Sequence, residues 1–403
     1  LVVVHNKYAE THGWVRTSCA FLDKEAGQLK QVSLGEGLGL RSERNIYALF
    51  RDALTGLEFI RESRLLHEKG LEFDLGAYQA FVFTDFKEVV DDREHSWRRI
   101  HEYLNGAGSY NLEQLRLELP VMQVLRPWRE IANRGYLGWL LQNRANQSRL
   151  RPAEQLTNEA AHKYGQFLEG VELLSQQTLP RHELNEKMLQ RFRAVFKLAG
   201  FDRCLTPAQR HAVLVGADFI LRGFNDDHWL VLFLWVFLCD LAGRGAAAYG
   251  LDANKLLEEW RLGAVIKECL GQMDRSEWNA SRMATLVKII LRLPALNAAG
   301  NPQTAADLLR LWMQDELIHD YLGVNTYEDI TWFNQEGFEE LVWWQAVLRL
   351  LDAMQSAGDE KEALAEQLVK ICKKLEKILF AEKQSEFKLQ LLMNKLEEIK
   401  LER

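Results

Sequence analysis

The sequence contains few cysteines, and their positions exclude most cysteine-based sites. The five are far apart and no two of them form a C-x-x-C pair: Cys19, Cys204, Cys239, Cys269 and Cys372. An odd number of scattered cysteines argues against a disulfide framework and against a zinc site. We therefore expect buried or idle thiols in a reducing compartment, which favours a cytoplasmic location over a secreted one.

The sequence also lacks an excess of positive charge. Its 403 residues include 50 Lys and Arg against 57 Asp and Glu, so the formal net charge is −7. No cluster of Lys and Arg forms a stripe of the kind that neutralises phosphates. Nucleic acid is therefore not an expected partner.

No apolar run in the sequence is long enough to cross a bilayer. The longest uninterrupted run, residues 229–239, lies between Asp227-His228 and Asp240. A membrane-spanning helix needs about 20 apolar residues. We therefore expect no membrane contact, and we predict that this run is a central buried helix.

Motifs for nucleophilic and nucleotide chemistry are missing as well. The sequence has no Gly-x-Ser-x-Gly elbow, and no base is evident beside any of the cysteines. Gly35, Gly37 and Gly39 alternate after a predicted strand, but no Lys-Ser/Thr pair follows them and no βαβ unit surrounds them. We expect a flexible loop there and no cofactor.

The N-terminal part of the sequence has the residue pattern of β-strands. The aromatic and β-branched run 46–50, a turn that includes Gly56 and a return run 57–60 predict a hairpin. Leu71, Phe73 and Leu75 alternate with acidic residues, as in a strand with one buried face. From Tyr78 onward apolar residues occupy both faces, which predicts a central strand covered on both sides. Further strands are predicted at 1–4, 14–22 and 29–34.

After Asp92 the spacing of apolar residues changes from two to about 3.6, and we place a domain boundary there. Thr206-Pro207 followed by Gln209 predicts a helix start, because the hydroxyl and the amide can bond the free N–H groups of the first turn. No fixed period relates the helices, which disfavours a regular solenoid. Helices are predicted at 97–104, 112–119, 121–131 with Gly135 as a stop, 136–142, 152–176 starting at Pro152, 182–198, 206–221, 229–242, 254–271, 278–293, 302–321 and 335–356.

Residues 359–403 carry a heptad-like track of apolar residues, with Asp359 and Glu362 as the predicted cap. The track is interrupted near Glu382 and Ser385. It can associate with another chain or fold back on its own bundle, and the interruption favours the second. The apolar positions are Leu364, Leu368, Ile371, Leu375 and Ile378, then Leu389, Leu392, Leu396 and Ile399.

Part of the chain resembles a known family. The matching motifs are Phe50-Arg51-Asp52, Thr55-Gly56, Phe59-Ile60-Arg61, Leu71, Leu75, Ala77-Tyr78 and Val82-Phe83. Together they resemble the β-sandwich that follows the catalytic barrel in large bacterial members of the α-amylase family, glycoside hydrolase family 13. Val4-His5-Asn6 and residues 13–18 look like the first strands of that region. Residues 322–325, 332–334 and 338–341 look like the helical tail of some of these proteins.

With this resemblance, the expected fold is α+β and mostly α. We expect an antiparallel β-sandwich at 1–92, a helical bundle at 93–358, and a long amphipathic helix or hairpin at 359–403. A chain of 403 residues is long enough for two or three domains. The plainer alternative is a small all-β domain that has no role beyond folding.

The resemblance implies an accessory, non-catalytic part of an enzyme that acts on α-glucans. A complete enzyme of that family needs a (β/α)₈ barrel that presents an Asp nucleophile, a Glu acid/base and a second Asp. This chain has no such barrel pattern and none of the family's catalytic motifs, so no catalytic residue is carried over. Because the sequence opens at Leu1 without an initiator Met, we expect the catalytic barrel upstream in the same polypeptide. The alternative is a structural or interaction protein, a helical scaffold that self-associates through 359–403.

Two sets of residues are candidates for ligand binding. Trp14, Tyr47 and Tyr78 of the strand region are the candidate carbohydrate contacts, because aromatic rings can stack on pyranose rings. Most large aromatic residues of such a region are nevertheless core residues.

Two Glu-x-x-His spacings form the second set, Glu159 with His162 and Glu316 with His319. In di-iron helical bundles this spacing places both ligands on one face of a helix. In a helical chain with ten histidines the spacing also arises by chance, so metal binding is the weaker alternative.

Overall fold

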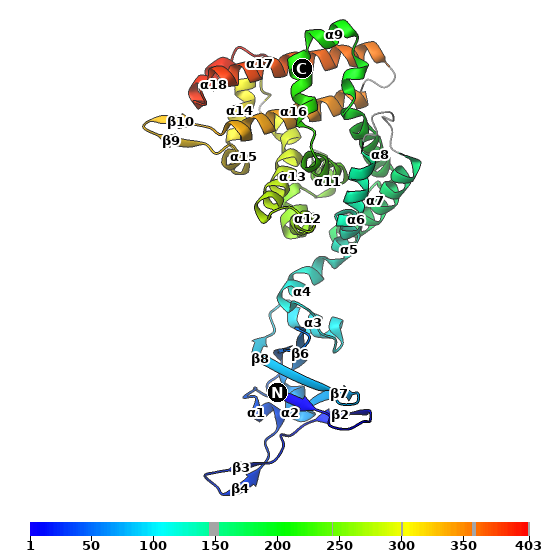
Figure 1. The fold of residues 1–403 in the computed structure, drawn as a ribbon, viewed down its shortest axis with the longest axis vertical. Helices are drawn as coiled ribbons and strands as arrows, with labels where there is room; N and C mark the ends of the chain where they lie inside the picture. The colour runs from blue at the N-terminus through cyan, green and yellow to red at the C-terminus, as the bar shows by residue number, and fades with distance from the viewer. Residues whose placement is uncertain (145–152, 244, 300, 357–359, 402–403) are drawn as a thin grey trace. The chain divides into compact units, whose positions relative to one another are not determined.

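The computed structural model describes residues 1–144, 153–243, 245–299, 301–356 and 360–401. The chain divides into two compact units, Leu1–Met122 and Gln123–Arg403. The first contains a small antiparallel sheet region, and the described residues as a whole are mostly helical (Figure 1). The predicted class, α+β and mostly α, is confirmed.

The strands of Leu1–Met122 pair in antiparallel fashion. A four-stranded sheet has the order β1–β8–β5–β6, and two further pairs are β2–β7 and β3–β4. The hairpin predicted around Gly56 is β5–β6 and is confirmed. The strands are β1 (Val2–Val4), β2 (Thr11–Val15), β3 (Phe21–Asp23), β4 (Gln28–Lys30), β5 (Ile46–Asp52), β6 (Glu58–Glu62), β7 (Leu71–Leu75) and β8 (Ala80–Val90).

Strand β5 has both of its faces buried. Ala48 and Phe50 belong to one hydrophobic cluster with Phe73 of β7. Tyr47 belongs to a second cluster with Trp97 of α3 (Ser96–Leu104). Successive residues of a strand point to opposite faces, so β5 lies between two cores. It is the strand that anchors this unit.

Three predictions for the strand region fail in whole or in part. The strand that follows Tyr78 is β8, which is central between β1 and β5 as predicted. Its residues 84–90 are exposed or half-buried, so β8 is not covered on both sides. Gly35 and Gly37, two of the three glycines predicted as a flexible loop, lie in a short helix, α1 (Leu34–Gly37). Ser33 Oγ accepts a hydrogen bond from Glu36 N (3.2 Å), and Glu36 Oε2 accepts one from Ser33 N (3.1 Å). This capping box starts the helix despite its glycines. The predicted strand 14–22 is also divided, between β2 and β3.

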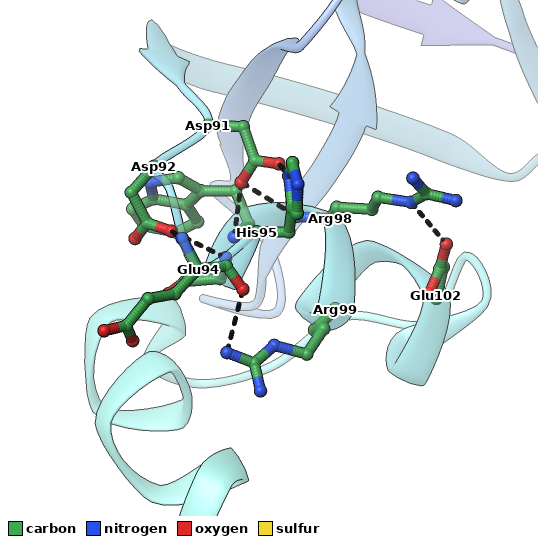
Figure 2. A network of polar contacts seen from close by, with 9 residues as sticks. Asp91, Asp92, Glu94, His95, Arg98, Arg99 and Glu102 are labelled. Carbon is green, nitrogen blue, oxygen red and sulfur yellow. Dashed lines mark hydrogen bonds and ion pairs between the residues drawn. The ribbon is translucent and has the colours of Figure 1, made fainter.

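Two aspartates connect the end of β8 to the first long helix. Asp91 Oδ1 accepts a hydrogen bond from Trp97 N (3.0 Å), and Asp91 Oδ2 lies 3.0 Å from His95 Nδ1. Asp92 Oδ1 accepts one from Ser96 N (2.9 Å), and bonds from Ser96 hold the pKa of Asp92 below its ordinary value. Figure 2 shows both carboxylates at the start of α3, where backbone N–H groups have no partner within the helix.

The first unit extends to Met122, beyond the change of periodicity at Asp92. Ile100 of α3 and Leu112 of α4 (Leu112–Glu118) are buried in the same cluster as Tyr47. The helices therefore cover one face of the sheet. The change of periodicity marks the passage from strands to helices within one compact unit.

The unit Gln123–Arg403 consists mainly of helices and also has a short hairpin, β9 (Asn325–Tyr327) and β10 (Ile330–Trp332). Its helices are α5 (Met122–Ile131), α6 (Arg134–Asn143), α7 (Glu154–Ser175), α8 (Arg181–Leu198), α9 (Pro207–Ala212), α10 (Leu214–Gly223), α11 (Asp226–Ala242), α12 (Leu262–Gln272), α13 (Glu277–Ala298), α14 (Ala305–Met313), α15 (Glu316–Tyr321), α16 (Gln335–Ser356), α17 (Lys361–Gln384) and α18 (Leu389–Leu396).

Helix α11 is the centre of this unit. It packs against α6, α8 and α13, and its residues 229–238 are buried without interruption. A helix that is apolar on every side belongs in a protein core, so the prediction of a central buried helix is confirmed. None of the described helices combines the length and the apolar character needed to cross a membrane.

Local signals at helix ends have mixed outcomes. Thr206 and Gln209 form the predicted capping box, with Gln209 N donating to Thr206 Oγ1 (3.3 Å) and Thr206 N donating to Gln209 Oε1 (2.9 Å). Gly135 is not a helix stop, because Asn133 caps α6 and Gly135 lies in its first turn. The helix start predicted at Pro152 and the cap residue Asp359 lie outside the described residues.

The C-terminal segment folds back on its own unit. Helix α17 packs along α16 and α10, and it turns near Ser385 into α18, which contacts α14 (Figure 1). Leu368, Leu375 and Leu396 of the heptad track are buried. These positions of the track therefore pack against helices of the same chain.

Candidate functional site

Tyr47, one of the three candidate carbohydrate contacts, is a core residue. Its side chain is 3 % exposed, and its ring centroid lies 5.7 Å from that of His101. Burial raises the pKa of Tyr47 to about 12. The ring is therefore not available to a carbohydrate, and the prediction for Tyr47 is wrong.

Trp14 is on the surface, but another side chain lies over its ring. It is 45 % exposed, in β2, and Lys69 Nζ lies 5.8 Å from its ring centroid. A cation over an indole face is attracted by the ring's quadrupole. A sugar that stacked on that face would have to displace the lysine.

Tyr78 is exposed and lies beside a second tyrosine that the sequence pattern did not indicate. Tyr78 is 65 % exposed and Tyr8 is 87 % exposed. Their ring centroids are 6.3 Å apart, and the ring planes are inclined at 42°. Tyr8 precedes β2 and Tyr78 precedes β8, so two separate turns bring the rings together.

The two turns are held together by hydrogen bonds. Tyr78 N donates to Lys7 O (3.3 Å) and His5 N donates to Gln79 O (2.9 Å). His5 Nδ1 lies 2.9 Å from Gly76 O, and Gly76 N donates to Gln79 Oε1 (2.8 Å). The backbone beneath both rings is therefore fixed before any ligand arrives.

The backbone of Tyr78 is itself unusual. Its φ is +56°, in the left-handed region that bulky residues rarely adopt. Such a conformation costs about 1–3 kcal/mol and persists only where the surroundings enforce it, often at binding sites. Together with the exposed ring, it makes Tyr8 and Tyr78 the strongest candidate for ligand contact in this unit. We call these two residues the tyrosine pair.

The two Glu-x-x-His spacings do not form a metal site in the described residues. Glu159 pairs with Lys163, with 3.4 Å between Oε1 and Nζ, and His319 Nδ1 lies 3.7 Å from Asp320 Oδ1. His162 is on α7, whereas Glu316 begins α15. No group of three or more His, Cys, Asp or Glu among the described residues is arranged to hold a metal ion.

Sequence reasoning missed a buried polar cluster in the helical unit. Glu340 of α16, with a side chain 8 % exposed, is its centre. His228 Nε2 lies 2.9 Å from Glu340 Oε1, Tyr321 OH donates to Glu340 Oε2 (2.5 Å), and Arg282 forms an ion pair with the same carboxylate. These partners come from α11, α15 and α13, so the cluster joins four helices.

The partners of Glu340 keep its carboxylate charged. Burial alone would raise the pKa of Glu340, but hydrogen bonds from His228 and Tyr321 and the charge of Arg282 outweigh it, and the pKa lies below its ordinary value. Burial and the neighbouring Glu340 raise the pKa of Tyr321. A carboxylate with three donors has little capacity left for a substrate, so this cluster orients helices and is not a reactive acid. The sequence feature that could have indicated this cluster is the position of Glu340 on the buried face of an apolar helix.

Comparison of the chain with protein-family models, with curated proteins and with solved structures found no match.

Proposed function

We propose that this chain is the accessory, non-catalytic C-terminal part of a glycoside hydrolase or transglycosylase of the α-amylase type, and that its tyrosine pair contacts an α-glucan. The catalytic barrel would precede residue 1 in the same polypeptide. The proposal is supported by the resemblance of residues 44–86 to the region that follows the barrel in that family. The observation that carries it is the exposure of Tyr8 and Tyr78 on two turns that hydrogen bonds hold together.

In this proposal, the four-stranded sheet and the β2–β7 pair are the two layers of a sandwich. Phe50 and Phe83 of the sheet share one hydrophobic cluster with Phe73 and Leu75 of the pair. The tyrosine pair lies at one end of these layers, in the turns that lead into β2 and β8. A rigid support of this kind lowers the entropy lost when the rings bind a flexible chain.

The geometry of the two rings suits a curved chain of sugars. Aromatic faces stack on the apolar faces of pyranose rings, and two rings inclined at 42° can contact successive units of a chain that bends. An α-1,4-glucan bends in this way, whereas a flat β-1,4 chain does not. Because the site is open, we expect weak binding, on the order of 1 mM for a short oligosaccharide.

The reducing location expected for the chain belongs to the same proposal. All five cysteines are free thiols in the structure. Burial raises the pKa of Cys239, Cys269 and Cys372, each to about 12, so these thiols stay protonated and unreactive. Their state is compatible with a cytoplasmic protein.

Affinity electrophoresis in gels that contain amylose or glycogen tests the glycan contact. We expect the chain to be retarded, and Tyr8→Ala and Tyr78→Ala each to weaken retardation about tenfold, which corresponds to about 1.4 kcal/mol of lost stacking. Tyr110→Ala is the matched control, because Tyr110 belongs to the same unit and is 81 % exposed. Absence of retardation, or an equal loss in Tyr110→Ala, would refute the glycan contact. Absence of a barrel in the upstream coding sequence would refute the relationship to the enzyme.

A further inference from the structure

The helical unit contains a cavity of about 690 Å³ between α14, α16, α17 and α18. Ligand sites are typically cavities of about 300–1,000 Å³ with mostly apolar walls and a few polar groups. The walls of this cavity follow that description, and its charged side chains lie toward one end. Figure 1 shows α16 and α17 running beside each other over much of their length.

One end of the cavity is apolar. Phe338 and Val342 of α16, Leu375 and Ile378 of α17, and Trp312 of α14 line it. A neutral sugar would find few hydrogen-bond partners among these side chains, whereas a hydrocarbon chain would be removed from water along its length.

The polar groups in the wall beside this apolar end bond to one another. Trp312 Nε1 donates to Asn297 Oδ1 (3.2 Å), and Asn297 Nδ2 donates to Gln345 Oε1 (2.8 Å). These groups are satisfied without a ligand. The surface that remains for an occupant of this end is therefore hydrocarbon.

The other end of the cavity carries an excess of positive charge. Arg349 and Asp352 of α16 and Lys370 and Lys374 of α17 line it, which gives three cationic groups against one anionic group. Arg349 and Lys370 are exposed to solvent. Burial raises the pKa of Asp352, and the charge of Arg349 opposes that shift.

The apolar end and the charged end of the cavity are separated along the axes of α16 and α17. From Phe338 to Arg349 a helix rises about 16 Å at ~1.5 Å per residue. Helix α17 runs in the opposite sense, so Ile378 lies toward Phe338 and Lys370 lies toward Arg349, and both residues line the same cavity. The distance matches the length of a medium-chain fatty acid.

We propose that this cavity binds a medium-chain fatty acid, with its hydrocarbon chain at the apolar end and its carboxylate beside Arg349 and Lys370. The chain would displace water from Phe338, Val342 and Ile378, and the carboxylate would accept charge-assisted hydrogen bonds from the guanidinium and the ammonium. The site belongs to the helical unit, so it is independent of the tyrosine pair.

Isothermal titration of the full chain with dodecanoate, kept below its micelle concentration, tests the proposal. We expect saturable binding of one molecule per chain and at least tenfold weaker binding of 1-dodecanol, which has the same chain and no charge. Arg349→Gln with Lys370→Gln is expected to weaken dodecanoate about tenfold and to leave 1-dodecanol unchanged. Ala346→Leu, which fills the cavity between its two ends, is expected to weaken both ligands.

The matched control is Lys373→Gln, which removes an exposed lysine of the same helix that does not line the cavity. It is expected to bind dodecanoate as the parent chain does. Thermal unfolding of each variant establishes that it is folded. The proposal is overturned if dodecanoate does not bind saturably, if Lys373→Gln weakens it as much as the double variant does, or if maltoheptaose competes for the same site.

Discussion

At the scale of single residues, two buried glutamates show that burial alone does not determine the charge of a carboxyl group. Glu340 has three donors and a lowered pKa. Glu382 is fully buried, neither of its carboxylate oxygens has a hydrogen-bond partner, and its pKa is raised by burial and by the charge of Glu339. The pKa of Glu340 is lowered because its carboxylate has partners from three other helices. The carboxylate of Glu382 has no hydrogen-bond partner.

We predict that Glu382→Gln stabilises the chain at alkaline pH. Because the pKa of Glu382 is raised by folding, its favourable contribution is complete below its unfolded pKa, about 4.3, and is lost as the pH rises through the folded pKa. The neutral amide removes that loss, so we expect a gain of about 1 kcal/mol at pH 8, comparable with the cost of an unsatisfied buried group, and little gain at pH 4.

Urea unfolding between pH 4 and pH 8 measures this effect. Glu386→Gln is the control, because Glu386 is exposed and its hydrogen bond from Lys388 holds its pKa below its ordinary value. The control is expected to show no gain at pH 8. A stability difference between Glu382→Gln and the parent chain that does not vary with pH would contradict the prediction.

The residues of the candidate site could be predicted only in part. The sequence indicates that Tyr78 and Tyr47 are aromatic residues in or beside strands, but it does not indicate which ring is covered. Tyr47 lies on the face of β5 that α3 and α4 cover, whereas Tyr78 is in a turn. Tyr8 was missed, although in the segment Lys7–Glu10 its only apolar neighbour is the small residue Ala9, which does not predict burial.

At the scale of helices and strands, local signals were reliable where they involve neighbouring residues. The predicted capping box at Thr206 depends on a side chain three residues from the cap, and the β5–β6 hairpin depends on a short turn around Gly56. The capping box at Ser33 has the same spacing but was not predicted. The first and last residues of the helices were less predictable. The predicted helix 206–221 is divided at Val213 into α9 and α10. No Gly or Pro at residues 212–214 indicates this break.

The heptad track of α17 yields a prediction at this scale. Leu368 is fully buried within its own chain, so we expect Leu368→Ala to lower the free energy of unfolding by about 2–5 kcal/mol without a change of molecular mass. Denaturant unfolding and light scattering measure the two quantities. Glu366→Ala, at an exposed position of the same helix, should change neither. A parent chain that is dimeric and becomes monomeric in Leu368→Ala would show that the track pairs with another chain.

At the scale of the whole molecule, the division at Met122 shows which helices belong to the sheet. Trp97, Ile100 and Leu112 share a buried cluster with Tyr47 and Ile60 of the strands. A domain that ended at residue 92 would expose that face of the sheet. Contiguous apolar surface of this kind destabilises a small domain, which has little other core.

We therefore predict that a fragment of residues 1–122 folds alone and that a fragment of residues 1–92 does not. The longer fragment retains both hydrophobic clusters of the unit, whereas the shorter one loses the helices that complete the second. Near-ultraviolet circular dichroism and urea unfolding distinguish them, with a cooperative transition expected only for the longer. Cooperative unfolding of both fragments with the same midpoint would place the boundary at Asp92.

The sequence by itself determined the class of the protein, the hairpin, most helices and the cap at Thr206, because each of these depends on residues within a few positions of one another. It also determined that 229–239 is a core helix, because a run that is apolar on every side can be satisfied only in a protein interior. The tertiary structure alone decided which tyrosines are exposed, where the first unit ends, which buried glutamate is charged and where the cavity lies. Each of those depends on side chains that are distant in the chain and meet only when the helices and strands pack.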